Sequence, residues 1–206
     1  MIEPEWLVMG RELRAIAQIG LTFTKDPFDR QRFERIREIS ASLMARGTDA
    51  DTAKIVDLFR QDAGYATPKV DVRGAAFQDG SLLLVREISD GRWTLPGGWA
   101  DVNQTPAECV VRELNEESGF ESRVTKLAAV HDYRSRNAPH HIDSIYKLFF
   151  ICELTGGSPR TSDETSDVAF FRRNDLPPLS LGRTTPGQIE LMFRHADEPG
   201  LPTEFD

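Results

Sequence analysis

Three glutamates near one end of a predicted helix could hold a metal ion. Glu113, Glu116 and Glu117 have the i, i+3 and i+4 spacing that places side chains on one face of a helix. Like charges at this spacing repel, and the negative end of the helix dipole disfavours them further. A divalent cation such as Mg²⁺ or Mn²⁺ reverses this cost, because hard cations prefer oxygen ligands. The alternative is a solvated acidic face without a chemical role.

The surrounding residues carry strong helix signals. Thr105 to Glu108 reads Thr-Pro-Ala-Glu, a capping box with proline at the first helical position. Gly119 supplies a left-handed stop, so the helix is predicted over Pro106–Ser118. A glycine-rich loop, Pro96-Gly97-Gly98, comes before it and lets main-chain groups approach a ligand closely. A loop of this kind that leads into an acidic helix indicates a site for phosphate and metal together.

The same stretch resembles the signature of the Nudix hydrolase family. That signature joins a glycine, a spaced glutamate, an Arg-Glu-aliphatic triplet, a Glu-Glu pair and a final glycine with an aliphatic residue. One position departs from it, because Gln104 stands where the family has its first glutamate. The positions in register are Gly98, Arg112 to Leu114, Glu116, Glu117, Gly119 and Phe120.

The resemblance extends over nearly the whole chain. Asp71–Gly74, Leu84–Glu87 and Trp93–Asp101 look like one bacterial subgroup that adds an N-terminal helical domain. The resemblance implies an α/β (α+β) fold, the Nudix α/β/α sandwich with a mixed sheet, and a homodimer formed through the helical segment. Its members act on nucleoside diphosphates linked to another moiety, typically CDP-choline or ADP-ribose. The expected domains are residues 1–64, helical, and residues 65–206, the Nudix hydrolase domain.

The resemblance also implies roles for the acidic helix. Glu113 and Glu117 would be the principal ligands of Mg²⁺ or Mn²⁺, with Glu116 beside them and the main-chain carbonyl of Gly97 as a further ligand. Arg112 would orient a glutamate through a charge-assisted bond. Such an ion would neutralise phosphate charge and make a water nucleophilic, giving a nucleoside monophosphate and a phosphorylated partner.

The identity of the general base stays open between Glu113, Glu116 and Glu164. In the family a further acidic residue often arrives from a loop after the long strand, and Glu164 occupies that place. A surface carboxylate without a role is the alternative for Glu164.

Gln104 leaves two other functions open. An amide keeps hydrogen bonds but supplies no negative charge and cannot act as a base. If the missing carboxylate were essential, the chain would be a nucleotide-sensing binding module with weak catalysis. We expect a supporting role for Gln104 instead, because it precedes the helix cap and lies off the face of Glu113 and Glu117. The other alternative is an enzyme that processes the 5′ end of RNA.

Several residues outside the helix are candidates for binding substrate. Arg73 and Arg86 lie near predicted strands and could contact phosphate or pair with surface acids. Trp99 could stack on a base, although large aromatic residues more often serve packing. The polar segment from His131 to His141 is interpreted as a substrate-side loop, in which Arg134 or Arg136 could meet phosphate; an exposed loop without function is the alternative.

The remaining periodicity predicts the elements that must position these residues. Apolar residues at helical spacing indicate a helix around residues 7–21, a second from Asp26-Pro27 to Arg46-Gly47, and a third over Asp51–Asp62. Pro68 marks a linker after them. Beyond it, strands are predicted at Val70–Phe77, Leu82–Val85, Ile145–Leu154 and Val168–Phe171, the first two joined by a turn at Asp79-Gly80.

Composition narrows the class of protein. The chain has 206 residues with 39% hydrophobic content, enough for a buried core. A net charge of -8 disfavours broad binding to a phosphate backbone, which needs an excess of lysine and arginine. Two cysteines are too few for a disulfide framework. No apolar run reaches membrane-spanning length, and the acidic start is unlike a secretory signal. A cytoplasmic protein without a membrane partner is expected.

Overall fold

The computed structural model describes residues 3–48, 51–136 and 139–206. The chain divides into two compact units, which are considered separately. One contains the residues up to Pro68 together with His140–Ser144, and the other contains Lys69–Pro139 and Ile145–Asp206. No helix among the described residues is long and apolar enough to cross a membrane.

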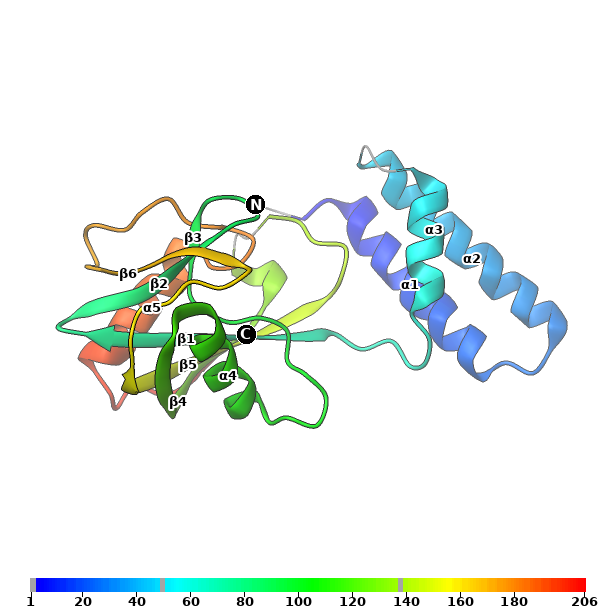
Figure 1. The fold of residues 1–206 in the computed structure, drawn as a ribbon. Helices are drawn as coiled ribbons and strands as arrows, with labels where there is room; N and C mark the ends of the chain where they lie inside the picture. The colour runs from blue at the N-terminus through cyan, green and yellow to red at the C-terminus, as the bar shows by residue number, and fades with distance from the viewer. Residues whose placement is uncertain (1–2, 49–50, 137–138) are drawn as a thin grey trace. The chain divides into compact units, whose positions relative to one another are not determined.

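The first unit is built from three helices, as the sequence predicts (Figure 1). Asp26 caps the second, because its side chain accepts hydrogen bonds from the N–H groups of Phe28 and Asp29. Asp51 caps the third in the same way. A small core of Leu7, Ala41, Met44, Ile55 and Phe59 holds them together. The helices are α1 (Glu5–Phe23), α2 (Pro27–Arg46) and α3 (Thr52–Gln61).

A short segment from much later in the chain completes this unit. Arg11 donates a hydrogen bond of 2.7 Å to the main-chain oxygen of His141. Arg14 forms an ion pair of 2.8 Å with Asp143, and its guanidinium lies 4.4 Å from the ring centre of Phe59. His140 and His141 therefore group with the helices, whereas the sequence placed them on a substrate-side loop.

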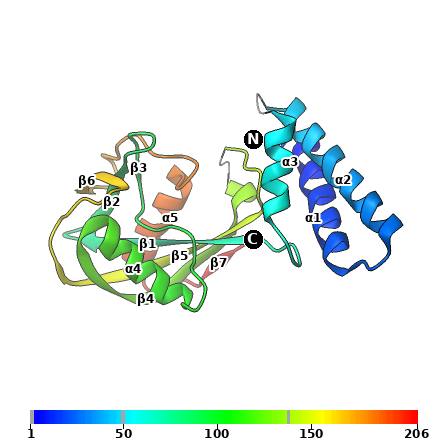
Figure 2. The ribbon, with the colours of Figure 1, turned by 45° about the vertical axis from the view of Figure 1, so that its right-hand side comes forward.

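The second unit is a seven-stranded mixed sheet with helices on both faces (Figures 1 and 2). The strand order is β3-β2-β1-β5-β4-β7, and β6 pairs with β2. β1 is parallel to β5 and antiparallel to β2. The elements are β1 (Lys69–Gln78), β2 (Ser81–Glu87), β3 (Trp93–Thr94), α4 (Pro106–Ser118), β4 (Phe120–Asp132), a 3-10 turn (Tyr133–Arg136), β5 (Ile145–Gly157), β6 (Thr165–Phe171), α5 (Pro186–Asp197) and β7 (Glu204–Phe205).

Two hydrophobic cores lie on opposite faces of the sheet, because side chains alternate along each strand. Ala75 and Phe149 face α5 and pack against Ile189 and other residues of that helix. Their neighbours Ala76 and Phe150 face α4 instead. The expected α/β/α sandwich with a mixed sheet is confirmed.

The four predicted strands are present, each slightly longer than expected, and the turn between β1 and β2 is the predicted one. Asp79 and Gly80 have φ angles of 50° and 72°, which a tight two-residue hairpin requires. Two large elements were missed in the sequence. β4 is a 13-residue strand that pairs with β5, and α5 covers one face of the sheet.

Candidate active site

The glycine-rich loop lies directly against β1. The N–H of Gly74 donates to the main-chain oxygen of Pro96 at 2.9 Å, and the N–H of Val72 donates to that of Gly98 at 2.8 Å. Gly97 has a φ of 139°, and a Cβ atom there would lie 2.0 Å from the oxygen of Val72. The loop can approach the strand this closely only because residue 97 has no side chain.

α4 has the predicted bounds and both predicted ends. The capping box of Thr105 and Glu108 is complete, and Gly119 adopts the left-handed conformation with φ of 78°. The helix packs against β1 where Gly74 leaves space, since a Cβ there would lie 3.0 Å from Val110 and 3.2 Å from Leu114. This contact sets the last turns of the helix beside the glycine loop.

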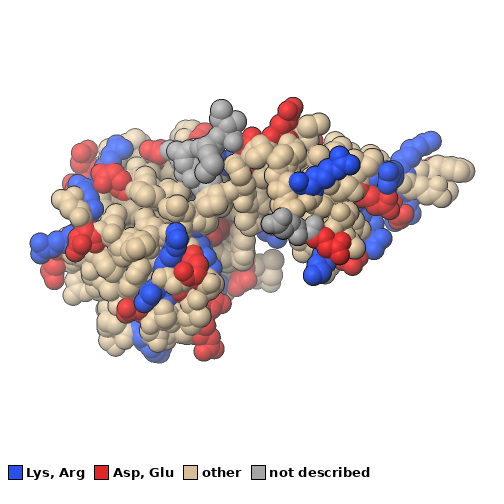
Figure 3. All heavy atoms as spheres, turned by 90° about the horizontal axis from the view of Figure 1, so that it is seen from above, with Lys and Arg blue, Asp and Glu red and all other residues tan. Residues whose placement is uncertain are grey.

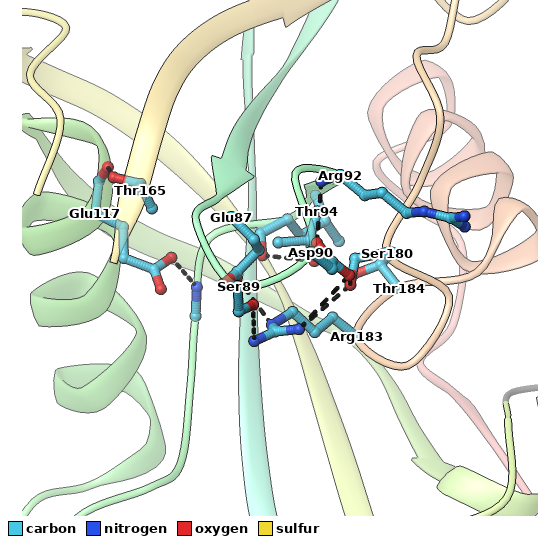
Figure 4. A network of polar contacts seen from close by, with 12 residues as sticks. Glu87, Ser89, Asp90, Arg92, Thr94, Glu117, Thr165, Ser180, Arg183 and Thr184 are labelled. Atoms are coloured by element: carbon cyan, nitrogen blue, oxygen red, sulfur yellow. Dashed lines mark hydrogen bonds and ion pairs between the residues drawn. The ribbon is translucent and has the colours of Figure 1, made fainter. Parts of the chain in front are cut away.

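Glu117 connects the helix to the loop. Its Oε2 accepts a hydrogen bond of 2.8 Å from the N–H of Gly97 (Figure 4). Its main-chain oxygen accepts a bond of 2.8 Å from the hydroxyl of Thr165, at the start of β6. The residue is only 5% exposed. Burial raises the pKa of Glu117 to about 8, against the opposing effects of Arg73 and of the bond from Gly97.

The other two glutamates of the helix have different surroundings. Glu113 is largely buried and lies against the loop, since a Cβ at Gly98 would be 3.1 Å from its carboxylate. Burial raises the pKa of Glu113, and Arg112 opposes this. Glu116 is exposed and paired with Arg112 at 2.7 Å. Arg112 also contacts Glu113 at 3.0 Å, so one guanidinium holds both carboxylates.

Gln104 is exposed and directly precedes the N-cap residue of this helix. Its side-chain oxygen accepts from Nε of Arg112 at 3.2 Å and from Sγ of Cys109 at 3.3 Å. Gln104 thus contacts Arg112 and Cys109, while Glu117 bonds to Gly97 and Thr165. Cys109 is fully buried.

A buried charge cluster lies at the start of β1. Arg73 donates two bonds to the carboxylate of Asp71, at 2.9 and 2.8 Å, and a third of 3.1 Å to the main-chain oxygen of Leu95. Lys147 contacts the same carboxylate at 2.8 Å. Burial alone would raise the pKa of Asp71, but these two cations lower it. Burial lowers the pKa of Lys147 to about 8.

The remaining predicted residues have their own partners. Arg86 is exposed and donates to the oxygen of Gly91 at 2.9 Å. Trp99 is also exposed, with the amine of Lys69 at 5.8 Å from its ring centre. Arg134 forms a two-pronged contact with Asp132. The side chain of Arg136 lies outside the described residues. The structure therefore brings Glu113, Glu117, Gly97 and Arg73 together. Arg86, Trp99 and Arg134 make their contacts elsewhere.

Two acidic residues outside the helix influence this region. Glu164 is exposed on the loop before β6, and its charge raises the pKa of Glu87 in addition to the effect of burial. Glu87 is buried at the end of β2, and its charge in turn raises the pKa of Glu117. Sequence reasoning missed Glu87. The available signal was strand alternation, which places Glu87 on the opposite face from its exposed neighbour Arg86.

The carboxylates of Glu113 and Glu117 fit a metal site in which substrate phosphates would supply further ligands. Within the described ranges, no three histidine, cysteine, aspartate or glutamate side chains are grouped to hold an ion by themselves. Glu113 and Glu117 nevertheless both face the glycine loop. Mg²⁺ typically uses one or two protein carboxylates together with waters and substrate phosphates. The buried, mutually repelling pair is therefore a suitable donor set for a hard cation.

The raised pKa of Glu117 predicts a pH-dependent stability in metal-free buffer. An unfolded glutamate ionises near pH 4.3, so between there and about 8 the folded state keeps a proton that the unfolded state releases. Stability should therefore fall as pH rises through this window. Glu117→Gln removes this contribution, so we expect the variant to gain stability relative to wild type, by on the order of a few kcal/mol at pH 8.5 and almost nothing at pH 4.5. Urea unfolding with chelator at both pH values measures it; equal pH dependence in both proteins would contradict the assignment.

Two glycine substitutions should have opposite effects on stability. Gly97→Ala places a methyl group against the main chain of Val72 and forces an unfavourable φ, so we expect a loss of about 2 kcal/mol or more in the free energy of unfolding. Gly187→Ala is the matched control, because that helical glycine has nothing within 4 Å of its Cβ position. It should leave stability unchanged or raise it by up to about 1 kcal/mol. Chemical denaturation tests both, and a neutral Gly97→Ala would refute the close approach of the loop.

Comparison with known proteins agrees with this geometry. Residues 4–59 match the family described as the UDP-X-like N-terminal oligomerisation domain, and residues 68–193 match the NUDIX domain. A Bacillus subtilis (strain 168) protein, provisionally named an ADP-ribose pyrophosphatase, is 42% identical over 205 residues, 100% of this chain and 99% of its own.

Two crystal structures are also similar. A UDP-X diphosphatase is 33% identical with a TM-score of 0.64, and the match covers 98% of each chain. An ADP-ribose pyrophosphatase from Streptococcus suis 89-1591 is 40% identical with a TM-score of 0.63, over 68% of this chain and 100% of its own. With the domain match over the sheet unit and a relative that spans the full length, the chain belongs to the Nudix hydrolase family.

Proposed function

We propose that this Nudix pyrophosphohydrolase cleaves a nucleoside diphosphate linked to another moiety, giving a nucleoside monophosphate and a phosphorylated partner. The observation that carries the proposal is the buried carboxylate of Glu117, which is bonded to a glycine loop and lies in the same region as Glu113. ADP-ribose and UDP-linked compounds are the first substrates to test, because similar proteins are named for them. CDP-choline is the other candidate.

Glu113, Glu117 and the main-chain carbonyl of Gly97 would hold Mg²⁺ or Mn²⁺, with Glu116 beside them. The bound ion would neutralise charge on the diphosphate and activate a water for attack. Glu117 must lose its proton for this role, and the N–H of Gly97 and the charge of Arg73 both favour its ionised form. Arg112 fixes the orientation of Glu113 and keeps Glu116 close to it.

The general base is one of Glu113, Glu116 and Glu164. Glu113 faces the glycine loop. Its pKa is raised and therefore lies closer to neutral pH than that of an ordinary glutamate, which suits a general base. Glu116 and Glu164 are exposed and could reach an attacking water from solvent. The geometry favours Glu113 on proximity to the loop and leaves the other two as alternatives.

Homodimerisation through the helical unit is part of the proposal. The matched domain is described as an oligomerisation domain. Large apolar side chains are exposed on its helices, as expected for a surface that a second copy covers. They are Val8, Met9, Ile16, Phe23, Phe28, Ile39 and Leu58. A cytoplasmic location is consistent with two free, buried cysteines.

The two alternative functions have less support. A binding module with weak catalysis requires Gln104 to replace an essential carboxylate, but the contacts of Gln104 are with Arg112 and Cys109. An enzyme acting on the 5′ end of RNA needs little basic surface for one terminal nucleotide, but binding along an RNA chain requires a continuous basic surface. On the face that Figure 3 shows, basic and acidic side chains are interspersed among the described residues. Hydrolysis of a small nucleotide therefore remains the function that the site supports best.

Glu117→Gln should abolish metal-dependent hydrolysis, with a loss of at least a thousandfold, because the amide cannot supply a negative ligand. The measurement is product analysis after incubation with Mg²⁺ and ADP-ribose, UDP-linked sugars, CDP-choline or 5′-triphosphorylated RNA. Glu121→Gln is the matched control on an exposed carboxylate outside the site, and it should keep wild-type rates. Retained activity of Glu117→Gln at saturating Mg²⁺, or cleavage of RNA alone, would overturn the proposal.

Gln104→Glu should change turnover by less than about tenfold. The new carboxylate would pair with Arg112, which already contacts Glu113 and Glu116, and it would add little charge near Glu117. Steady-state kinetics on the best substrate of the panel tests this. A gain of a hundredfold or more would show that the missing glutamate limits catalysis in this chain.

A further inference from the structure

The loop between β6 and α5 brings one arginine, Arg183, into the region of Glu117. The loop docks on the hairpin of β2 and β3, as Figure 4 shows. Main-chain bonds join Trp93 to Pro178 at 3.0 Å and to Ser180 at 2.8 Å. The hydroxyl of Ser180 donates to Asp90 at 2.7 Å, and the hydroxyls of Thr94 and Thr184 lie 2.9 Å apart. The loop is thus fixed to the segment that leads directly into the glycine loop.

Each of the three nitrogens of the Arg183 guanidinium has a neighbouring polar partner. Its Nε contacts Oε1 of Glu87 at 2.9 Å, and its terminal nitrogens donate to the hydroxyls of Ser180 at 3.3 Å and Ser89 at 3.2 Å. The nitrogen that donates to Ser180 also lies 4.0 Å from Oδ2 of Asp90, so two carboxylates flank the guanidinium. Arginine has five N–H groups, more than these contacts occupy, and the side chain is 35% exposed.

Electrostatic coupling ties this arginine to the candidate active site. Its partner Glu87 is buried, and the charge of Glu87 raises the pKa of Glu117. The charge of Arg183 contributes to lowering the pKa of Lys147, whose amine contacts Asp71. In Figure 4 the side chain of Arg183 extends from its loop toward Ser89 and Glu87, on the side of the view where Glu117 lies, whereas Arg92 extends to the opposite side.

The arginines predicted from the sequence are less suited to this role. Arg73 is buried and gives three bonds to Asp71 and Leu95. Arg134 is engaged with Asp132. Arg86 is exposed and bonded to Gly91. Arg183 combines partial exposure with an orientation fixed by Glu87, Ser89 and Ser180.

We propose that Arg183 binds the diphosphate of the substrate, and that Glu87 is the positioning residue that holds its guanidinium in place. The planar fork of arginine matches two phosphate oxygens, and a charge-assisted pair of this kind adds both affinity and orientation. This inference rests on the proposed function, because it takes a nucleoside diphosphate as the ligand.

A purely structural ion pair is the competing explanation. It would make Arg183 a link between the loop and β2. The loop, however, is already attached by the two bonds to Trp93, by Ser180 with Asp90 and by Thr184 with Thr94. The loop is therefore attached without Arg183, and attachment alone does not account for this partly exposed arginine.

The test compares Arg183→Gln with Arg92→Gln, an exposed arginine of the same hairpin. Binding of the methylene analogue of ADP, whose bridge cannot be hydrolysed, is measured by calorimetry with Mg²⁺, and kcat and KM are measured on the best substrate. We expect Arg183→Gln to weaken binding of the analogue and to raise KM, each by at least tenfold, with a smaller effect for Arg183→Lys. Arg92→Gln should match wild type. Unchanged binding in Arg183→Gln would overturn the proposal.

A double variant separates ligand binding from structure. Arg183→Gln alone leaves Glu87 buried without its cation and should lower Tm. Adding Glu87→Gln removes that charge and should restore Tm, while binding of the analogue stays weak. Recovery of binding together with Tm would show that the pair is only structural. If wild type hydrolyses none of the diphosphates, the proposed function fails, but calorimetry with the analogue still decides the role of Arg183.

Discussion

The hydrogen bond from the N–H of Gly97 to the carboxylate of Glu117 is the contact on which the site depends. It requires a loop that lies against β1 without a side chain at residue 97, and a helix whose last turn ends at the same place. Both ends of that helix are set by local chemistry, the capping box of Thr105 and the left-handed Gly119. The sheet supplies the remaining constraint, because Gly74 lets α4 approach β1 closely. The geometry of this hydrogen bond depends on all of these features together.

Opposite charges on neighbouring segments make this burial tolerable. Asp71 holds Arg73 and Lys147 at the start of β1 and β5, and the field of Arg73 reaches Glu117. Arg73 and the bond from Gly97 oppose the effect of burial on the pKa of Glu117, which suits a group that must give up its proton when a cation arrives. A fully apolar setting would keep this carboxyl group protonated, and a fully exposed one would leave it hydrated and mobile.

Whether a feature can be predicted from the sequence depends on how far apart its interacting residues lie along the chain. Helix α4 was predicted to the residue because its capping signals are local. The burial of each glutamate was not predicted, because Glu117 becomes buried only when the glycine loop packs against it. α5 carries the same Thr-Pro-x-Gln type of cap at Thr185, a signal that was overlooked. The pair of Glu87 and Arg183 had no such signal, since its residues meet only after β6 folds back onto β2. The roles assigned to the site residues stay predictions.

The segment His140–Ser144 makes the helical unit discontinuous along the chain. Arg11 and Arg14 obtain two of their partners from it. During synthesis the three helices emerge from the ribosome long before these residues do, so the unit cannot reach its final set of contacts until more than half of the polypeptide has been made. A fragment cut at one boundary before β1 would therefore keep the core that the three helices share but lose these two contacts of Arg11 and Arg14.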